Sequence, residues 1–394
     1  MVNREAPRVD RGKILEWLKE MVSTESVNPS LVPGGGGEAA MARFVADVCA
    51  GMGLDVRIDE PSAGRPNVIA VLRGARPSRE RNLLLNGHLD TVALGGMKDA
   101  LVPRESGGRL YGRGSLDMKG GLAAILGALE ALSRSNLRLE GDVVLAATSD
   151  EEYASIGAQH VAGEIDAGGA VIAEATGMGL CLAHKGFAWL KVETYGKAAH
   201  GSLPAAGVDA IAKMGKFLAE LDEYSRTELG TRTHHLLGNP SVHASTITGG
   251  TELSTYPDRC TLMIERRTIP GETADGVLGE MKGILDRLSR SDRSFVAECE
   301  VTLYRPPYEV GGDSAIAVAV SDAFTSVMGK PPHVVGVAAW LDSGIFGPRG
   351  IPCVIMGPSG QGQHGDEEFV NLDSVYDLAQ TLAGTALRFC GAHK

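Results

Sequence analysis

The sequence predicts an α/β fold in which a mixed, mainly parallel sheet is sandwiched by helices and interrupted by an inserted, ferredoxin-like α+β domain. Three observations predict this: nearly continuous apolar strands in the first third, helical periodicity between them, and a different element order in the middle. Strands without apolar/polar alternation are typical of a sheet covered on both faces. Helices between such strands indicate right-handed βαβ units.

The first third supplies most of the larger domain. Apolar residues fall on one helical face in Ile14–Val22 and again in Met41–Val48, which predicts two helices. A third helix-like stretch, Met118–Leu132, lies between the second and third of four short apolar runs. These runs, which we expect to be strands, are Asn67–Leu72, Asn82–Asn86, Asp142–Ala147 and Gly169–Ala173.

The middle of the chain has the order β-α-β-β-α-β, the split βαβ arrangement of ferredoxin-like domains. Its predicted elements are strands at Phe187–Tyr195, Val242–Thr248, Arg259–Thr268 and Phe295–Leu303, with helices near Val208–Leu221 and Val277–Leu288. The α/β pattern then resumes with a helix near Ser314–Met328, a strand near Cys353–Met356 and a final helix from about Leu372. We therefore expect one domain at 1–186 and 304–394 and an inserted domain at 187–303.

Composition excludes several classes of protein. Apolar residues make up 43% and charged residues 22% of the 394, as in globular proteins. The formal net charge of −11, without a basic stripe, argues against nucleic-acid binding. The first eleven residues lack the apolar run of a secretory signal, and no window approaches the roughly eighteen apolar residues of a membrane span. The six scattered cysteines are expected to be reduced and mostly buried, so we expect a cytoplasmic protein.

A histidine and an aspartate follow the second apolar strand, in Asn86-Gly-His88-Leu-Asp90. Strand alternation places His88 and Asp90 on the same side. The imidazole could then bind a metal while the Asp90 carboxylate accepts its other N–H. Taken alone this motif is weak, because a surface histidine or a capped histidine in the core is the more common explanation.

Further acidic and histidine residues follow other strands. Asp117 lies in the Gly-rich stretch Gly112–Gly120, which runs into a helix that Asp117 could simply cap. The run Asp150–Glu152 follows the third strand; most acidic runs are solvated loops, but cations between the carboxylates would offset their repulsion. Glu174 follows the fourth strand, and His364 lies in a Gly-rich loop after the last one.

Together these positions place two histidines and four acidic side chains at the ends of successive strands, where open α/β sheets bind ligands. Two zinc ions about 3.5–4 Å apart need a bridging carboxylate and roughly two further ligands each. The set is filled by Asp117 as bridge, His88 with Glu174 on one ion, and Glu152 with His364 on the other. Glu151 is then left beside a bridging water. Nitrogen and oxygen ligands without thiolates fit zinc, although cobalt or manganese could substitute.

The chain resembles the co-catalytic zinc hydrolase family of acetylornithine deacetylase, succinyl-diaminopimelate desuccinylase, aminoacylase and the glutamate-releasing carboxypeptidases. The resemblance rests on Gly87–Asp90, Gly112–Gly120, Asp150–Glu152 and His364, and it runs along nearly the whole chain. It implies hydrolysis of the amide bond of a small N-acyl amino acid, with Glu151 as general base. The alternatives are a metallopeptidase acting on short peptides and, in another class, a binding protein with a degenerate metal site. The presence of all the ligand positions disfavours the binding protein.

The resemblance also implies a homodimer formed through the inserted domain, which matches that family's dimerisation or lid domain. His200, in Gly196–Pro204, is similar to a histidine that reaches into the active site of the partner subunit, where it would stabilise the oxyanion. An arginine in the family binds the substrate carboxylate. We prefer Arg267 to Arg266 for this role, because adjacent strand residues face opposite ways. Ser254 occupies a position where many relatives have asparagine, and its shorter side chain puts that substrate contact in doubt.

Overall fold

The computed structural model describes residues 6–393 and divides them into two compact units. The first comprises the chain up to Leu182, Val310–Val335 and the part from Leu341 onward. The second comprises Ala183–Glu309 and the short segment Gly336–Trp340. The sequence pattern did not predict that Gly336–Trp340 returns to the second unit.

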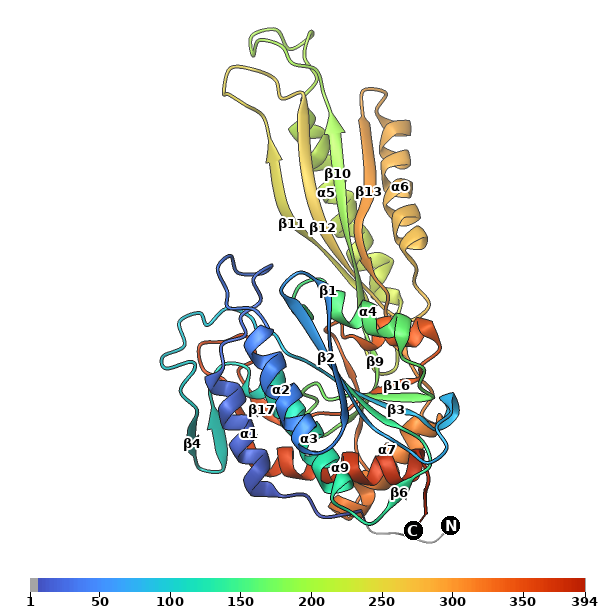
Figure 1. The fold of residues 1–394 in the computed structure, drawn as a ribbon. Helices are drawn as coiled ribbons and strands as arrows, with labels where there is room; N and C mark the ends of the chain where they lie inside the picture. Colours follow the sequence, from blue (N-terminus) through green and yellow to red (C-terminus); the bar gives the residue numbers. More distant parts are fainter. Residues whose placement is uncertain (1–5, 394) are drawn as a thin grey trace. The chain divides into compact units, whose positions relative to one another are not determined.

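The first unit is built on a mixed sheet (Figure 1). In spatial order its strands are β1 (Asp55–Ser62), β2 (Arg65–Leu72), β7 (Val143–Thr148), β3 (Leu83–His88), β8 (Gly169–Ile172), β16 (Cys353–Ile355) and β9 (Leu180–His184). The predicted α/β class with a mixed sheet is confirmed. The central strands β7, β3, β8 and β16 pair in parallel. β2 is antiparallel to both β1 and β7, and a tight turn at Ala63 and Gly64 connects it to β1.

Helices cover this sheet because its central strands are apolar on both faces: every residue of β3 and β7 is buried. The helices are α1 (Arg11–Ser23), α2 (Ala39–Gly51), α3 (Gly120–Ser133), α4 (Ile156–Glu164), α7 (Ala315–Met328), α8 (Ser343–Phe346) and α9 (Leu372–Phe389). α3 packs against α1 and α9, and α7 also packs against α9. α1 begins where Asp10 accepts from the N–H groups of Gly12 and Lys13, so its first turn is capped.

Short strands join loops of the first unit. β17 (Gly360–Gln361), β18 (Phe369–Asn371), β5 (Arg109–Tyr111) and β4 (Arg104–Ser106) form one small sheet, and β6 (Arg138–Leu139) pairs with β19 (Ala392–His393). β14 (Tyr308–Glu309), which belongs to the second unit, and β15 (Val334–Val337), which spans the boundary between the units, pair with β9. The antiparallel pairing of β5 with β18 brings the Gly112–Gly120 loop next to the loop that contains His364.

The second unit has the element order β10 (Gly186–Tyr195), α5 (Ala210–Thr227), β11 (Ser241–Gly249), β12 (Arg259–Thr268), α6 (Ala274–Ser291) and β13 (Val296–Arg305). Its antiparallel strands lie in the order β11-β12-β10-β13, the ferredoxin-like arrangement. Residues alternate between buried and partly exposed along β12, and its buried face packs with α5 and α6 around Leu190, Phe217 and Met281. A role for this unit in dimerisation stays a prediction.

No helix within residues 6–393 is both long and apolar enough to cross a membrane. All six cysteines are buried, and none forms a disulfide within the described residues.

Candidate metal centre

Three neighbouring strands direct polar residues to one edge of the large sheet. β7, β3 and β8 are adjacent and parallel, so the segments that leave their carboxyl ends lie together. His88 is the last residue of β3, Glu151 and Glu152 follow β7, and Glu174 follows β8. The structure therefore brings together residues that lie up to 86 positions apart in the chain (174 − 88).

His88 lies at the centre of this group, and its side chain is 1% exposed. Its Nε2 lies 3.2 Å from Oδ1 of Asp117 and 3.2 Å from Oε1 of Glu174. The same nitrogen lies 3.9 Å from Oε2 of Glu151. One imidazole nitrogen thus faces three carboxylates.

Asp117 faces two histidines with its two oxygens. While Oδ1 lies near His88, Oδ2 lies 3.3 Å from Nε2 of His364. That nitrogen is also 3.2 Å from Oε2 of Glu152. Asp117 does not cap α3, whose first turn has no side-chain cap. The chain reaches this position through Gly114, whose φ of +77° favours glycine and where a Cβ would come within 2.7 Å of Thr91.

Burial and mutual repulsion make these carboxylates hard to ionise without a cation. Burial raises the pKa of Glu152 to about 7, and the charge of Asp117 adds to that rise. Burial also raises the pKa of Glu151 well above its usual range; His88 opposes this shift, and Asp342 and Glu174 strengthen it.

The same carboxylates favour the protonated form of the neighbouring imidazoles. Hydrogen bonds to Asp117 and Glu152 raise the pKa of His364 to about 10. Burial opposes ionisation of Asp117, yet its hydrogen bonds with His364 and His88 hold its pKa well below the usual range. The cluster therefore attracts positive charge, which protons supply when no metal is bound.

The residues present fit a pair of metal ions. Possible ligand atoms of His88, Glu151 and Glu174 lie within 4.8 Å of one another, as do those of His88, Asp117 and Glu152. Oε1 of Glu152 is buried, and no residue in the described part of the chain hydrogen-bonds to it. A buried carboxylate oxygen without a donor is costly unless a cation compensates it. Imidazole nitrogen and carboxylate oxygen are ligands that suit zinc, manganese or cobalt.

The expected role of the Asp90 carboxylate differs in the structure. Nδ1 of His88 lies 2.9 Å from the backbone carbonyl oxygen of Asp90 and 3.6 Å from Oδ1, which is too long for a hydrogen bond. The carboxylate instead accepts from the backbone N–H groups of Glu151 and Glu152, each at 3.1 Å. Asp90 thus holds the acidic turn in place, and its carbonyl orients His88.

A buried network behind Asp150 was not predicted from the sequence. Nη2 of Arg65 lies 2.6 Å from Glu38 Oε1 and 2.8 Å from Asp150 Oδ1. Asn28 donates to Asp90 at 2.7 Å and to Asp150 at 3.0 Å. All five side chains are buried. These residues come from separate loops and strands, so no local spacing could have identified them.

Asp342, which precedes α8, is a further residue that the sequence analysis missed. It is 2% exposed, and burial raises its pKa to about 7. Its charge also raises the pKa of Glu151, so the two carboxylates lie in one electrostatic environment. Asp342 stands in no motif that would have signalled this position.

The other predicted residues, His200, Ser254 and Arg267, lie in the second unit. The segments of His200 and Ser254 are adjacent: Gly201 N–H donates to the carbonyl of Ser254 at 2.7 Å, and both side chains are exposed. Nδ1 of His200 accepts from Ser202 N–H at 3.2 Å, so this nitrogen is engaged within its own loop.

The two neighbouring arginines of β12 differ in burial. Arg266 is fully buried and pairs with Glu272. Arg267 is 32% exposed, pairs with Glu265 at 2.7 Å and lies over the ring of Phe187. Only Arg267 therefore presents part of its side chain to solvent.

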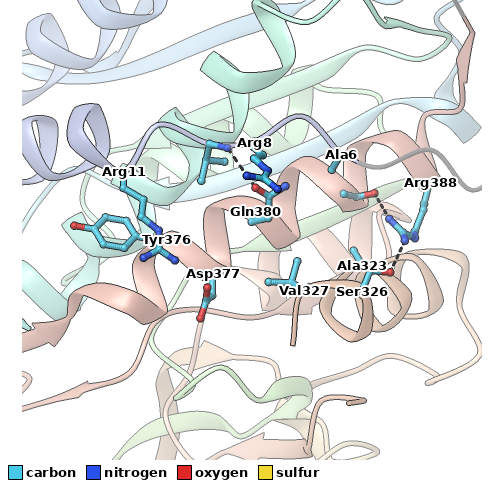
Figure 2. Close-up of a pocket in the computed structure, with 12 residues that line it drawn as sticks. Ala6, Arg8, Arg11, Ala323, Ser326, Val327, Tyr376, Asp377, Gln380 and Arg388 are labelled. Carbon is cyan, nitrogen blue, oxygen red and sulfur yellow. Dashed lines mark hydrogen bonds between the residues drawn. The ribbon is translucent and has the colours of Figure 1, made fainter. Parts of the chain in front are cut away.

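A separate hollow of about 740 Å³ lies between α7, α9 and the segment that precedes α1 (Figure 2). None of the predicted site residues lines it. Arg11 at its edge pairs with Asp373 and stacks on Tyr376, and Arg388 donates to Ser326. Because these two guanidinium groups are already engaged, the metal cluster is the stronger candidate for chemistry.

Comparison with known proteins confirms the resemblance predicted from the sequence. The family model described as peptidase family M20/M25/M40 matches residues 84–388. The acetylornithine deacetylase of Myxococcus xanthus is 29% identical over 340 residues, which cover 85% of this chain and 87% of that protein.

Solved structures show the same fold at low identity. The aminopeptidase PepT of Bacillus cereus has a TM-score of 0.81 and 20% identity, with 97% of this chain and 99% of that chain covered. A dinuclear metal-binding peptidase of Bacillus subtilis has a TM-score of 0.74 and 15% identity, with 96% and 97% covered.

Proposed function

The chain belongs to peptidase family M20/M25/M40 and is a metal-dependent hydrolase, and on this premise we propose that it hydrolyses the amide bond of a small N-acyl amino acid. The observation that carries the metal-dependent part of the proposal is the position of Asp117, while the acetylornithine deacetylase relative supports the N-acyl substrate class. Its two oxygens face the imidazole nitrogens of His88 and His364 at 3.2 and 3.3 Å. This is the arrangement that a carboxylate shared by two cations requires.

In this proposal His88 and Glu174 hold one ion, Glu152 and His364 hold the other, and Asp117 contacts both. Zinc is the metal that we propose, with cobalt or manganese as substitutes. When bound, such a pair would supply a Lewis acid for the amide carbonyl and would lower the pKa of the attacking water.

Glu151 is the general base in this scheme. Its backbone is held by Asp90, and its carboxylate lies 3.9 Å from His88 at the edge of the cluster. A base works best when its pKa is near the working pH, and burial moves the pKa of Glu151 upward. Glu151 takes the proton of the attacking water and returns it to the departing amine nitrogen.

We propose that residues of the second unit contact the substrate. Arg267 binds the carboxylate of the amino-acid part, which is supported by the burial of Arg266 and the partial exposure of Arg267. Nε2 of His200 stabilises the oxyanion, and Ser254 contributes a weaker contact. We further propose a homodimer in which His200 serves the partner's site. β11 supports this: it is an edge strand, and eight of its nine residues are exposed.

The alternative substrate is a dipeptide or short peptide. Hydrolysis of such a peptide would use the same metal centre, because a peptide bond is also an amide. Zinc titration of chelator-stripped protein, followed by a hydrolysis screen over N-acetyl amino acids, N-succinyl amino acids and dipeptides, tests both versions. We expect two zinc ions per chain and the fastest turnover on an N-acyl amino acid.

Asp117→Ala should weaken both zinc sites, whereas Asp373→Ala, whose side chain is 85% exposed, should bind as wild type does. Binding of fewer than two ions by the wild-type protein would overturn the two-metal proposal. Faster turnover of dipeptides would favour the alternative substrate.

A further inference from the structure

A buried ion pair that plays no part in the chemistry proposed above joins the loops that carry Asp117 and His364. It consists of Glu368, four residues after His364, and Arg113, four residues before Asp117. Their side chains are 1% and 2% exposed, and Nη1 of Arg113 lies 2.9 Å from Oε2 of Glu368. We call this pair the Glu368 clasp.

The Glu368 carboxylate is saturated by hydrogen bonds from the Asp117 loop. Oε1 accepts from the backbone N–H groups of Leu116 at 2.8 Å and Asp117 at 3.0 Å. Oε2 accepts from Gly114 N–H at 2.9 Å in addition to Arg113. One side chain therefore accepts from three backbone N–H groups of the loop that ends at Asp117.

Arg113 fixes the other loop in return. Its Nη2 donates at 2.8 Å to the carbonyl of Gly365, the residue after His364, and its Nε donates at 2.9 Å to Ala93. His364 needs such a restraint, because its own side chain is 56% exposed and its φ of +60° is uncommon for a residue other than glycine.

The small sheet explains how the pair meets. Phe369 of β18 lies opposite Tyr111 of β5, and Gly112 N–H donates to the carbonyl of Glu368 at 3.1 Å. This register places Glu368 at the point where the Asp117 loop leaves β5. The buried side chain then reaches the amides of that loop.

We propose that Glu368 is a positioning residue that sets the spacing of Asp117 and His364 and thereby the affinity of the ion held by His364 and Glu152. This inference rests on the proposed function, because it assumes that these side chains are metal ligands. Groups that hold metal ligands in place typically change metal affinity about 10–100-fold when mutated.

The test compares Glu368→Gln with Glu367→Gln. Glutamine has the same shape but places an NH₂ group where the carboxylate accepts hydrogen bonds, so some of the four donors lose their acceptor. Glu367 is the exposed neighbour and serves as the matched control. We measure zinc affinities by titration of chelator-stripped protein, and amide hydrogen exchange at Gly114, Leu116 and Asp117 in the metal-free protein.

In Glu368→Gln we expect the affinity for the ion held by His364 and Glu152 to fall about 10–100-fold. The other ion shares only Asp117 with it and should weaken less. The three amides should exchange faster, and Glu367→Gln should match wild type in both measurements. Wild-type affinity for both ions in Glu368→Gln would overturn the proposal, and so would an equal loss in Glu367→Gln.

The zinc titration of the wild type separates this inference from the proposed function. If the wild-type protein binds no zinc, the proposed function fails, and the role of Glu368 toward a metal fails with it. If the wild type binds two ions and the mutant also does so equally tightly, only the positioning role fails.

If Glu368→Gln does not fold, Arg113→Lys is the second variant. It keeps the charge and the three backbone bonds of Glu368, but a lysine cannot contact Glu368, Gly365 and Ala93 together. We expect it to weaken the ion held by His364 and Glu152 more than the other, and unchanged zinc binding would contradict the positioning role of the Glu368–Arg113 pair.

Discussion

Nδ2 of Asn28 lies 2.7 Å from Oδ2 of Asp90 and donates its second hydrogen to Oδ1 of Asp150 at 3.0 Å. This one amide joins the loop before α2 to the two segments that carry His88 and Glu151. Asn28 is fully buried, and its own Oδ1 accepts from Ser30 N–H at 2.9 Å. The turn Asp150–Glu152, which follows a strand of the large sheet, is thus fixed by a residue that does not belong to that sheet.

Asn28→Ala should both destabilise the protein and weaken metal binding, because it leaves two buried carboxylates short of a donor. We expect the free energy of unfolding to fall by about 3 kcal/mol and zinc affinity to fall about tenfold. Asn239→Ala is the control, because Asn239 also donates to two acceptors but lies in the second unit. Thermal unfolding and zinc titration should show a loss of stability alone in the control.

Glu151→Ala should bind two zinc ions yet lose most turnover. Removing a general base typically costs about 10²–10⁴-fold in rate, while the proposed ligands stay in place. Metal analysis and kcat measured on one preparation check this. A mutant with a near-normal kcat would refute the assignment of Glu151 as base.

Metal binding should release protons, and zinc affinity should rise with pH. In the metal-free cluster the pKa of His364 is about 10 and that of Glu152 about 7, so at pH 7 the imidazole is charged and the carboxyl is half protonated. Both must lose their protons to bind a cation. Affinity should therefore fall as pH decreases, by about tenfold per unit for each proton released.

Calorimetric titration in two buffers of different ionisation enthalpy counts those protons. His364→Ala should release about one proton fewer than wild type at pH 7. Heats that do not depend on the buffer would show that the metal-free cluster holds no such protons.

Mixed dimers should recover activity if His200 acts in the partner's site. Glu151→Ala and His200→Ala chains are each expected to be nearly inactive. A hybrid of the two contains one site with both residues intact. Activity after mixing and re-equilibration should approach about a quarter of wild type, since half of the dimers are hybrids and each has one complete site. Activity that does not rise on mixing would count against the role of His200 across the dimer.

The sequence predicted the fold class well because apolar strands and amphipathic helices are local patterns. It also singled out His88, Asp117, Glu151, Glu152, Glu174 and His364, since each follows an apolar strand or stands in a glycine-rich stretch, and the structure brings all six into one cluster. The antiparallel placement of β2 was not predicted, because strand periodicity does not specify the direction of a neighbour.

The supporting residues illustrate what local patterns leave out. Asn28, Glu38 and Arg65 are polar residues in loops or at element ends, where most such residues are solvated. Their role depends on Asp150, which lies 85 positions after Arg65 and at the end of another strand. Likewise, the sequence predicted that the Asp90 carboxylate would orient His88, but the backbone amides of Glu151 and Glu152 occupy it.

The sequence by itself determined which side chains lie at this edge of the sheet. The apolar runs identify the strands, and the polar residues that directly follow each run identify the side chains at the strand ends. Only the tertiary structure decided which oxygen faces which nitrogen, and which buried groups hold them there. Hydrogen bonds are shorter than about 3.5 Å and directional, so they depend on the packing of distant segments, as in the contact of Glu368 with the amides of Leu116 and Asp117.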